Sequence, residues 1–312
     1  MLIAKSPSMK PVLELIEKAQ LSGATVLLRG ETGTGKEIVA QTIARGSARR
    51  DRPFVPINCA ALPDSLLESE LFGHVRGSFT GAHRDHPGAF AMAHTGTIFL
   101  DEIGETSGAF QARLLRVLQE REVRPLGGIQ STAVDVRVIA ATHRHLETEM
   151  KAGRFREDLY YRLAVFPIDL PPLRKRPEDI QALADHFIAH YAASEGKDGC
   201  ALPANSRTLL AVHSWPGNVR ELQNQIQRAV ALADPGAPLE PRFFSRTLVE
   251  LASVLADEPL LGRSLREQLD RVEALLIARA LDRHQGQKTR TATSLGITRE
   301  GLYKKMKRLG IA

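Results

Sequence analysis

The chain has 312 residues, enough for about two domains, and its 43% hydrophobic and 25% charged residues are typical of a globular protein. No run of residues reaches the roughly 18 apolar positions of a membrane span, and the start, MLIAKSPSMK, lacks the apolar core of a secretory signal. Cys59 and Cys200 are far apart and not in a metal-binding spacing, which fits small buried hydrophobes in a reducing compartment. We therefore expect a cytoplasmic protein with no membrane partner.

The net charge of +6 is confined to one end of the chain. From Gly286 to the C-terminus there are seven basic residues and one acidic residue, whereas residues 1–285 carry equal numbers of the two. A neutral body followed by a basic segment is typical of a protein that binds nucleic acid through that segment.

Short apolar strands alternate with helical patterns through the first part of the chain. Strands are predicted over residues 25–30, 54–58, 97–102 and 136–142. Residues 108–121 have the spacing of an amphipathic helix. This alternation predicts an α/β fold with a parallel, doubly wound sheet that is covered by helices on both faces.

The strand pattern ends around FPIDLPPLRKRPEDI (166–180). Three amphipathic helical patterns follow and predict a small helical subdomain, which the Pro- and Gly-containing segment 233–242 closes. A long helical pattern, residues 264–284, then leads into the basic segment.

GETGTGKE (30–37) satisfies most of the phosphate-binding pattern G-x-x-x-x-G-K-[ST]. It follows a predicted strand and opens a helix, so its backbone N–H groups, the charge of Lys36 and the helix dipole can all act on phosphate. Glu37 stands where a hydroxyl usually holds Mg²⁺. Its carboxylate either approaches the metal through water or turns away and leaves the metal to other residues.

TIFLDE (97–102) places two carboxylates at the carboxyl end of a strand, where α/β proteins bind their ligands. Asp101 is predicted to hold Mg²⁺, and Glu102 to orient or deprotonate the attacking water. Alone, an Asp-Glu pair at a strand end is more often a solvated cap. Together with the lysine loop it predicts a nucleoside triphosphatase.

Two arginines, Arg156 and Arg162, lie six residues apart in RFREDLYYRLAVF. They either pair with the neighbouring Glu157 and Asp158, or they stabilise phosphoryl transfer in an adjacent subunit. The pattern alone leaves both interpretations open.

Three further residues are candidates for sensing the γ-phosphate. Arg220 lies in the first turn of a predicted helix in WPGNVRELQNQ, within the helical subdomain. Thr142 and His143 follow the fourth predicted strand, where polar side chains can reach the phosphate.

GSFTGA (77–82) is a turn framed by Gly77 and Gly81, which permit a sharp excursion out of a helix. Phe79 and Thr80 form its apolar tip. The turn either folds back and buries Phe79 in the protein's own core, or it presents Phe79 to a partner protein.

From Ile3 to about Ala233 the chain resembles the AAA+ domain of bacterial enhancer-binding proteins, the activators of sigma-54 RNA polymerase. The resemblance covers nearly the whole domain. It is carried by GETGTGKE, INCAAL, ESELFGH, GSFTGA, GTIFLDEIGE, LLRVLQE, AATH, FREDLYYRL, LPPLRKR and WPGNVREL.

The resemblance implies an AAA+ P-loop ATPase that uses ATP and Mg²⁺ and assembles as a homo-oligomer, from dimer to hexameric ring. Asn58 would be the switching partner of Glu102, and the two arginines would act on the neighbouring subunit. The implied catalytic residues are Lys36, Asp101, Glu102, Asn58, Arg156 and Arg162. The implied ATP-binding residues are Gly30, Glu31, Thr32, Gly33, Thr34, Gly35, Lys36, Glu37, Ala93, Asp101, Glu102, Thr142, His143 and Arg220.

Glu37 and His143 compare differently with the pattern of the family. Glu is usual in the family at the position of Glu37, whereas Asn is often found where His143 stands. Imidazole can also donate a hydrogen bond, so His143 is expected to tune the sensor rather than abolish it.

GSFTGA is similar to the G-A-F-T-G-A loop of the family, with Ser78 in place of alanine. The resemblance implies that the state of the bound nucleotide raises this loop toward sigma-54. The implied contact residues are Gly77, Ser78, Phe79, Thr80, Gly81 and Ala82.

The basic segment is predicted to form a helix over about 288–295, a turn at Gly296-Ile297, and a second helix that Thr298 caps. A solvated basic helix is the simpler interpretation, but the turn and the localised charge favour a helix-turn-helix that places its second helix in the major groove. It resembles the all-α Fis-type domain, in which the preceding helix commonly dimerises. The predicted DNA contacts are Lys288, Arg290, Thr298, Arg299, Tyr303, Lys304, Lys307 and Arg308.

The resemblance implies an activator that binds enhancer DNA and uses ATP hydrolysis to convert the closed complex of sigma-54 and RNA polymerase into the open complex. Many relatives place a receiver or ligand-sensing domain before the ATPase, so control by such a regulatory domain or by a separate regulator protein is open. The expected domains are the ATPase subdomain (1–170), the lid (171–235), a linker (236–262) and the helix-turn-helix domain (263–312).

Two other classes of protein share part of this pattern. A DNA-dependent AAA+ motor, such as a helicase loader, would have the lysine loop, the arginines and a basic tail, but it has no need for GSFTGA. A DNA-binding repressor with a decayed ATPase is disfavoured because Lys36, Asp101 and Glu102 are intact.

Overall fold

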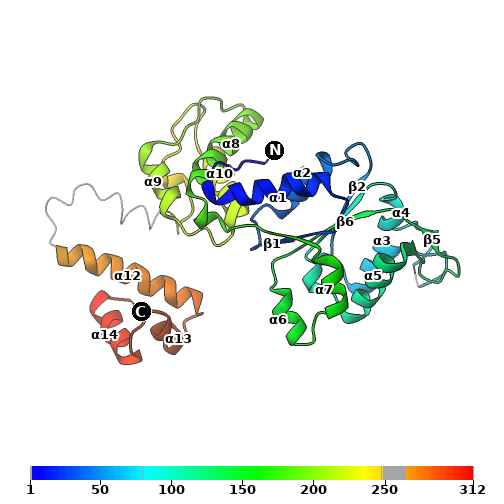
Figure 1. Cartoon of the computed structure of the whole chain (residues 1–312). Helices are drawn as coiled ribbons and strands as arrows, with labels where there is room; N and C mark the ends of the chain where they lie inside the picture. Colours follow the sequence, from blue (N-terminus) through cyan, green and yellow to red (C-terminus); the bar gives the residue numbers. More distant parts are fainter. Residues whose placement is uncertain (1, 80, 247, 249–264, 312) are drawn as a thin grey trace. The chain divides into compact units, whose positions relative to one another are not determined.

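A computed structural model of the protein describes residues 2–79, 81–246, 248 and 265–311. The chain forms two compact units (Figure 1). The first comprises Met1–Leu202 and Leu210–Leu239, and the second comprises Pro203–Leu209 and Glu240–Ala312.

The first unit is built on a five-stranded sheet with the strand order β2-β3-β6-β1-β7. Every neighbouring pair is parallel, so the carboxyl ends of the strands share one edge. This confirms the predicted doubly wound α/β fold. The strands are β1 (Val26–Arg29), β2 (Phe54–Asn58), β3 (Thr97–Asp101), β6 (Arg137–Thr142) and β7 (Phe166–Asp169).

β7 was not among the predicted strands. It is only four residues long and contains Pro167, which interrupts a strand pattern. Because β7 lies at an edge of the sheet, Pro167 removes no ladder hydrogen bond that a further strand would need. β2 forms the other edge and likewise contains a proline, Pro56.

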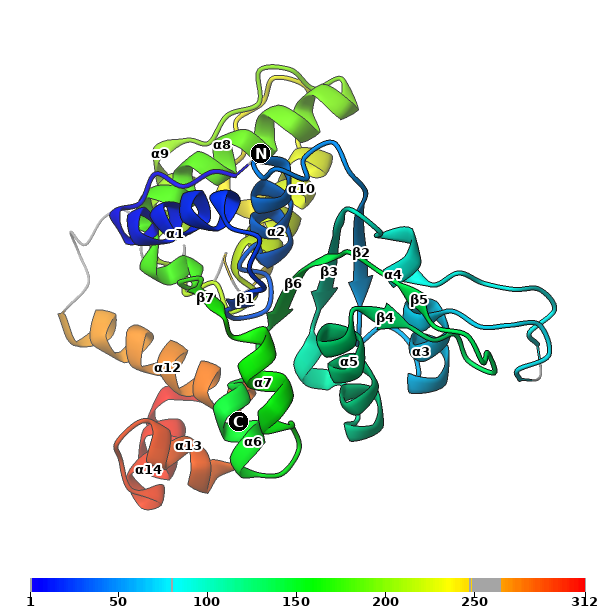
Figure 2. The same cartoon turned by 45° about the vertical axis from the view of Figure 1, so that its right-hand side comes forward.

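Helices cover both faces of the sheet, as Figures 1 and 2 show. On one face, α1 (Lys10–Leu21) and α2 (Lys36–Arg45) pack on Val26 and Leu28 of β1, whereas Leu27 faces the opposite core. This alternation is the two-residue period of a strand. The other face carries α3 (Asp64–Phe72), α4 (Ala89–Met92), α5 (Gly108–Glu120), α6 (Leu146–Lys151) and α7 (Glu157–Leu163).

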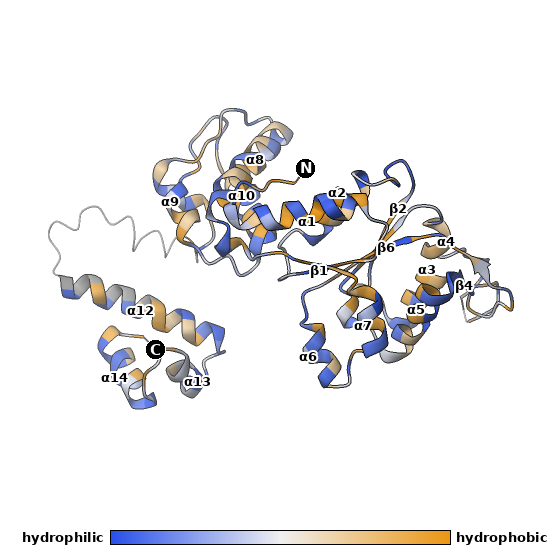
Figure 3. Cartoon of the chain, viewed as in Figure 1, coloured by the Kyte–Doolittle hydropathy of each residue, from blue (hydrophilic) through white to orange (hydrophobic). Residues whose placement is uncertain are grey.

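The hydropathy of the chain follows these layers. In Figure 3 hydrophobic colour concentrates along the strands and on the sides of the helices that meet the sheet. Leu114 and Leu115 of α5 are buried in this way, as the predicted helical spacing requires.

The helical subdomain follows β7 through the short helix η3 (Leu173–Lys175). α8 (Pro177–Glu195) and α10 (Asn218–Leu232) pack against each other. Trp215, just before α10, is fully buried, and its Nε1 donates a hydrogen bond to Leu210 O at 2.9 Å. α9 (Ala204–Val212) lies between these two helices in the sequence.

Two loops beyond α3 and α5 lie side by side at one end of the unit (Figure 2). One follows α3 and contains GSFTGA, and the other joins β4 (Glu122–Val123) to β5 (Thr132–Ala133) in a small antiparallel hairpin. His74 N donates to His86 O at 3.0 Å, and Leu126 N donates to Gly73 O at 2.8 Å. The hairpin was not predicted, because each of its strands is two residues long.

In the second unit, α12 (Leu265–Arg283), α13 (Lys288–Ser294) and α14 (Arg299–Leu309) surround a small core. Gly296 has a φ of +66° in the turn between α13 and α14, and Thr298 caps α14 by accepting a hydrogen bond from Gly301 N at 3.0 Å. The predicted helix-turn-helix and its N-cap are confirmed. Its core is formed by Ile277, Ala292, Leu302 and Met306, with Leu281, Leu295, Ile297, Leu309 and Ile311 packed against it.

α12 keeps part of its apolar surface exposed. Leu269 and Leu276, seven residues apart, are both more than half exposed. Across the described ranges of the chain, no helix combines the length and the apolar character needed to cross a membrane.

Candidate nucleotide site and partner surfaces

The loop between β1 and α2 has the backbone shape of an anion-binding site. Gly33 and Gly35 have φ angles of +81° and +99°, a region that residues with a Cβ rarely occupy. Gly35 is also the N-cap of α2, so the first N–H groups of that helix have no intrahelical acceptor. Backbone donors at a helix N-terminus suit a phosphate ligand.

Lys36 lies over this loop and is only 6% exposed. Its Nζ donates to Gly30 O at 2.9 Å and lies 3.7 Å from Glu102 Oε1. The ammonium group therefore lies between the loop and the end of β3, where a bound phosphate would need a counter-charge.

Asp101 and Glu102 lie at the carboxyl end of β3, as predicted. Burial, and then the charge of Glu102, raises the pKa of the Asp101 carboxyl. Glu102 has a φ of +55°, which is uncommon for a non-glycine residue and is frequent at functional sites. Two carboxylates this close together favour the binding of a cation, which would lie between the carboxylates and an anionic ligand.

Glu102 is bound by His143 and not by Asn58. His143 Nδ1 lies 2.6 Å from Glu102 Oε2, and the His143 backbone N–H donates to the same oxygen at 3.2 Å. Asn58 lies opposite Asp101 in the β2–β3 ladder, but its Oδ1 accepts from Ala60 N at 2.9 Å. The predicted pairing of Asn58 with Glu102 therefore has no hydrogen bond to support it in this conformation.

Two residues predicted at the nucleotide site are directed elsewhere. Glu37 is exposed on α2 and accepts a hydrogen bond from Gln41 Nε2 at 3.2 Å, so its carboxylate follows its own helix. Ala93 follows α4 and is wholly buried just before β3 begins at Thr97. The lysine loop lies at the opposite end of the strands, about 15 Å away along a five-residue strand, which argues against Ala93 as a nucleotide ligand.

Thr142 and Arg220 lie on two sides of the loop. Gly30 N donates to Thr142 O at 3.3 Å, and the buried Thr142 hydroxyl accepts from Arg144 N at 3.0 Å. Thr142 therefore shapes the turn that carries His143. Arg220 is exposed on α10, and its Cβ lies 3.2 Å from the point where a Cβ at Gly33 would be.

Asn218 joins the loop to the helical subdomain, and it was not among the predicted site residues. It is fully buried at the start of α10, where its Nδ2 donates to Thr32 O at 3.0 Å and its Oδ1 accepts from Leu173 N at 2.8 Å. Val219 N adds a hydrogen bond to Gly33 O at 2.9 Å. The signal was present in WPGNVREL: Asn218 has a φ of +52°, which asparagine tolerates better than most residues.

An ion pair ties the same loop to η3. Glu31 accepts two hydrogen bonds from the Arg174 guanidinium, at 2.6 and 2.8 Å, and this pairing lowers the pKa of the Glu31 carboxyl to about 2. The buried Arg176 donates to Thr34 O at 3.2 Å. The lysine loop is thus held by side chains from beyond the sheet.

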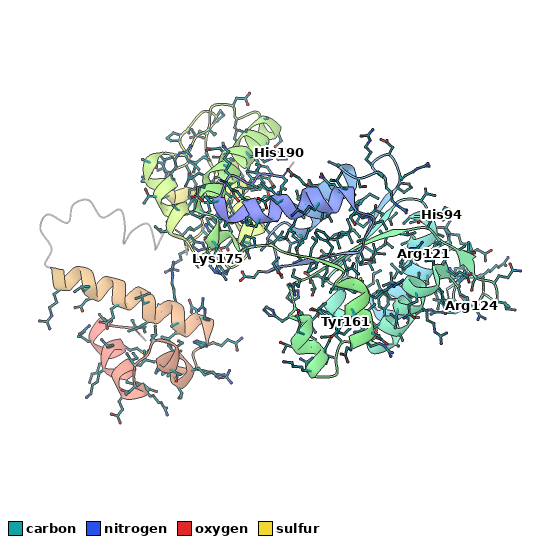
Figure 4. The ribbon with its side chains drawn as sticks, viewed as in Figure 1. His94, Arg121, Arg124, Tyr161, Lys175 and His190 are labelled. Atoms are coloured by element: carbon teal, nitrogen blue, oxygen red, sulfur yellow. The ribbon has the colours of Figure 1, made fainter. Side chains whose placement is uncertain are left out.

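The two arginines predicted to act on the neighbouring subunit already have partners within their own chain. Arg156 is the N-cap of α7, and its guanidinium binds Asp158 at 3.0 and 2.7 Å while 46% of its side chain stays exposed. Arg162 Nη2 donates to Leu118 O at 2.9 Å, near the end of α5. The alternative left open by the pattern, pairing with Asp158, is therefore observed for Arg156. Figure 4 labels Tyr161, which lies on the same helix and is 65% exposed.

The GSFTGA loop turns back sharply between α3 and α4. Gly77 has a φ of +79°, and its N–H donates to Ala82 O at 2.9 Å. Phe79 is 39% exposed, and its ring packs edge-on against His74 with 5.1 Å between the ring centroids. The interpretation that buries Phe79 in the core is therefore wrong. Thr80 lies outside the described residues.

α14 carries most of the predicted DNA contacts. Its Tyr303 ring is exposed and is close to two cations, with Lys288 Nζ at 4.8 Å and Arg299 Cζ at 5.8 Å from the ring centre. This places an aromatic ring and two positive charges on one surface of the helix-turn-helix, a composition that suits a phosphate backbone.

Arg308 and Lys305 are instead held against α12. Arg308 Nη2 lies 2.9 Å from Asp270 Oδ1, and both basic side chains also bind Glu273. The hydrogen bond from Lys305 is the main reason that the pKa of Glu273 is lowered. Because the Arg308 guanidinium is paired with two carboxylates, it is less available to DNA than a solvent-exposed arginine would be.

Three family models match the chain one after another. Residues 2–169 match the sigma-54 interaction domain, residues 174–258 the AAA+ ATPase lid domain, and residues 268–309 the Fis family of bacterial regulatory proteins. The chain belongs to the sigma-54-dependent transcriptional regulators. It is an AAA+ ATPase of that family with a helix-turn-helix domain, as its resemblance predicted.

Several curated regulators are similar over almost the whole chain. The hydrogenase transcriptional regulatory protein HoxA of Cupriavidus necator is 48% identical over 307 residues, which are 96% of this chain and 63% of that protein. The regulatory protein AtoC of Escherichia coli is 45% identical over 99% of this chain and 68% of its own length. The transcriptional regulatory protein ZraR of the same species is 48% identical over 98% of this chain and 68% of its own length. The chain thus spans between 63% and 68% of the length of these relatives.

Solved structures agree in fold. Crystal structures of NtrX from Brucella abortus in complex with ATP and with ADP superimpose with a TM-score of 0.72 at 32% sequence identity. The superposition covers 99% of this chain and 69% of that chain.

Proposed function

We propose that this regulator is an ATP-driven transcription activator of the bacterial cytoplasm. It binds enhancer DNA through its helix-turn-helix domain and assembles into a ring, a hexamer, with ATP and Mg²⁺ at the subunit interfaces. Hydrolysis remodels the closed complex of sigma-54 and RNA polymerase into the open complex. The units that carry these tasks are the ATPase subdomain (1–170), the lid (171–235) and the DNA-binding domain (263–312), with residues 236–262 as the linker.

ATP hydrolysis is supported by the groups gathered around the lysine loop. Backbone N–H groups of the loop and the Lys36 ammonium bind the phosphates, and Glu102 orients or deprotonates the attacking water. In the present conformation Glu102 is bound by His143 at 2.6 Å and lies 3.7 Å from Lys36, so it must leave these partners to reach a water. His143 is therefore the residue that we expect to control when Glu102 becomes available.

The acidic end of β3 fits a magnesium ion. Burial and the nearby Glu102 charge raise the pKa of Asp101, and a cation would offset that unfavourable crowding. Within the described residues no group of three potential ligands could hold an ion alone, so phosphate and water oxygens must complete the coordination. When bound, Mg²⁺ neutralises charge on the phosphates.

The observation that carries the proposal is the exposure of Phe79 on a loop of the same unit. A single aromatic residue, 39% exposed and flanked by glycines, can bind a pocket of a partner protein and can move without unfolding the core. A DNA-dependent AAA+ motor has no need for such a loop. The loop therefore supports a protein partner, sigma-54.

Two substitutions test this proposal. Lys36→Ala removes the charge at the phosphates, so we expect it to lose both ATP hydrolysis and promoter opening. Thr80→Ala alters only the tip of the loop, so we expect it to keep hydrolysis and lose opening. Hydrolysis is measured by phosphate release, and opening is measured on a sigma-54 promoter in vitro.

Ser78→Ala is the matched control for the loop, because it gives the sequence that is usual in the family. We expect it to retain both activities. Normal promoter opening by Thr80→Ala would contradict the loop assignment. ATP hydrolysis that is stimulated by DNA, together with no promoter opening at a sigma-54 promoter, would favour the DNA-dependent motor instead.

A further inference from the structure

Gln111 is a polar residue in the middle of an apolar helix face. It lies on α5 next to Phe110 and one turn before Leu114 and Leu115, and like Phe110 and Leu114 it is 0% exposed. A buried amide destabilises a fold unless its hydrogen-bonding groups are satisfied. Its position in this core therefore points to a contact that an apolar residue could not make.

The amide joins two segments that are far apart in the sequence. Its Nε2 donates to Thr106 O at 2.9 Å and to Arg154 O at 3.1 Å, and its Oε1 accepts from Arg156 N at 2.8 Å. Only this orientation of the amide satisfies all three partners, because the opposite one would place N–H against N–H and oxygen against oxygen.

One of the two segments follows the catalytic carboxylates. Glu105 N donates to Glu102 O at 3.0 Å, and the Thr106 hydroxyl donates to Ile103 O at 2.8 Å, which makes a short rigid turn after Glu102. Thr106 O, the acceptor of Gln111, ends this turn. The amide is thus anchored to the segment that carries the catalytic glutamate of its own subunit.

The other segment carries Arg156. Phe155 is buried beside it, and Arg156 itself is the N-cap of α7, the residue at which the backbone enters the helix. Gln111 holds the backbone N–H of Arg156, and Asp158 holds its guanidinium at 3.0 and 2.7 Å. The side chain of Arg156 is therefore half-exposed, whereas its backbone is fixed by a hydrogen bond from the core.

We propose that Gln111 is a positioning residue for Arg156, and that it holds this arginine where it can act on ATP bound by the neighbouring subunit. The inference rests on the proposed ring with arginines acting in trans. Gln111 is wholly buried and bonded to both segments, and the proposal is that its effect on hydrolysis passes through the position of Arg156. A displacement of about 1 Å at such a group can lower a rate by roughly 100-fold.

Gln111→Met keeps the length of the side chain and removes all three hydrogen bonds. We expect its kcat for ATP hydrolysis to fall by roughly 10- to 100-fold with little change in KM, because the lysine loop of the same subunit is intact. Gln111→Leu serves as a second variant of similar polarity, and thermal melting with ATP present checks that both are folded. Gln119→Met, on the exposed side of the same helix, should leave kcat unchanged.

Mixing subunits separates an effect in trans from one within the subunit. Gln111→Met has an intact ATP site and a misplaced arginine, whereas Lys36→Ala has a defective ATP site and a correctly held arginine. In a randomly mixed closed ring, roughly a quarter of the interfaces then pair an intact site with a well-placed arginine. We therefore expect two nearly inactive proteins to recover hydrolysis when mixed in equal amounts.

Arg156→Ala mixed with Lys36→Ala is the matched control for the ring itself. Recovery in both mixtures supports the role of Gln111. Recovery with Arg156→Ala but not with Gln111→Met would show that Gln111 acts within its own subunit. That result would overturn the role of Gln111 and leave the proposed ring unaffected. If neither mixture recovers, the trans action of Arg156 is wrong, and the inference falls with it.

Discussion

The lysine loop and the GSFTGA loop are both glycine-containing turns of the ATPase unit, but they are held in different ways. The lysine loop receives side chains from elements beyond the sheet, including the buried Asn218 and the paired Arg174. The described residues in and beside the GSFTGA loop are held by backbone hydrogen bonds among themselves, by the adjoining hairpin, by a hydrogen bond from Arg76 N to Asp85 and by the edge-on contact between Phe79 and His74.

This difference follows from what each loop has to do. A site that aligns phosphate with a catalytic carboxylate needs a fixed geometry, and fixed geometry comes from several independent contacts. A loop that moves with the nucleotide state must be released at a small cost, so it belongs to the least stabilised part of the fold. Three substitutions test whether the two loops differ in this way.

Asn218→Ala should have the largest effect. It leaves the buried Leu173 N and the partly buried Thr32 O without their partner, and an unsatisfied buried group costs about 1–3 kcal/mol, so we expect a loss of about 3 kcal/mol in the free energy of unfolding. ATP binding should weaken as well. Denaturant unfolding and ATP titration measure the two effects.

Asn224→Ala is the matched control, since this asparagine is exposed on the same helix. It should change stability by less than about 0.5 kcal/mol. Equal effects of the two variants would show that the contact of α10 with the loop does not stabilise the site.

Gly127→Ala tests the weaker of the two loops. Gly127 has a φ of +72°, and a Cβ at this position would lie 2.8 Å from Ser78 Cβ. Backbone strain and crowding together should lower the free energy of unfolding by about 2 kcal/mol and displace the GSFTGA loop. Hydrolysis should be unchanged, and limited proteolysis of the loop should become faster.

Gly153→Ala isolates the crowding from the strain. Gly153 has nearly the same φ, +71°, but a Cβ there would have no neighbour within 4 Å. Only the excess of Gly127→Ala over Gly153→Ala reports the contact with Ser78. Identical losses, with equal proteolysis of the loop, would mean that the hairpin does not support the GSFTGA loop.

Arg174→Ala should have the smallest effect, and that effect should depend on pH. The ion pair lowers the Glu31 pKa from 4.5 to about 2, so its stabilisation is fully present above pH 4.5 and is lost as the pH falls toward 2. Because both side chains are more than 40% exposed, we expect only about 1 kcal/mol. Melting temperatures of variant and wild type should differ at pH 7 and converge as the pH falls below 4.

Lys175→Ala is the control for charge alone, because Lys175 (Figure 4) lies in the same short helix without binding Glu31 directly. Its loss should produce a smaller difference over the same pH range, because the Lys175 charge lowers the Glu31 pKa less than the Arg174 hydrogen bonds do. A pH-independent difference for Arg174→Ala would rule out the ion pair as the source of stability.

Much of this protein could be predicted because the relevant patterns are local. The lysine loop, the strand ending in Asp101 and Glu102, and the turn at Gly296 each combine a hydrophobic period with residues that favour one backbone conformation. The helix-turn-helix was predicted with its core and its N-cap for the same reason. Such features depend on neighbours in the sequence, so they can be read in it directly.

Which polar groups meet depends on the packing of distant segments. Asn58 was the expected partner of Glu102 and His143 a sensor of the γ-phosphate, and only the fold shows that His143 binds Glu102 while Asn58 caps its own turn. Gln111 and Asn218 looked like ordinary helix residues, yet each connects segments more than 40 residues away. A buried polar side chain is defined by the partners that packing brings to it, and no local pattern specifies those partners.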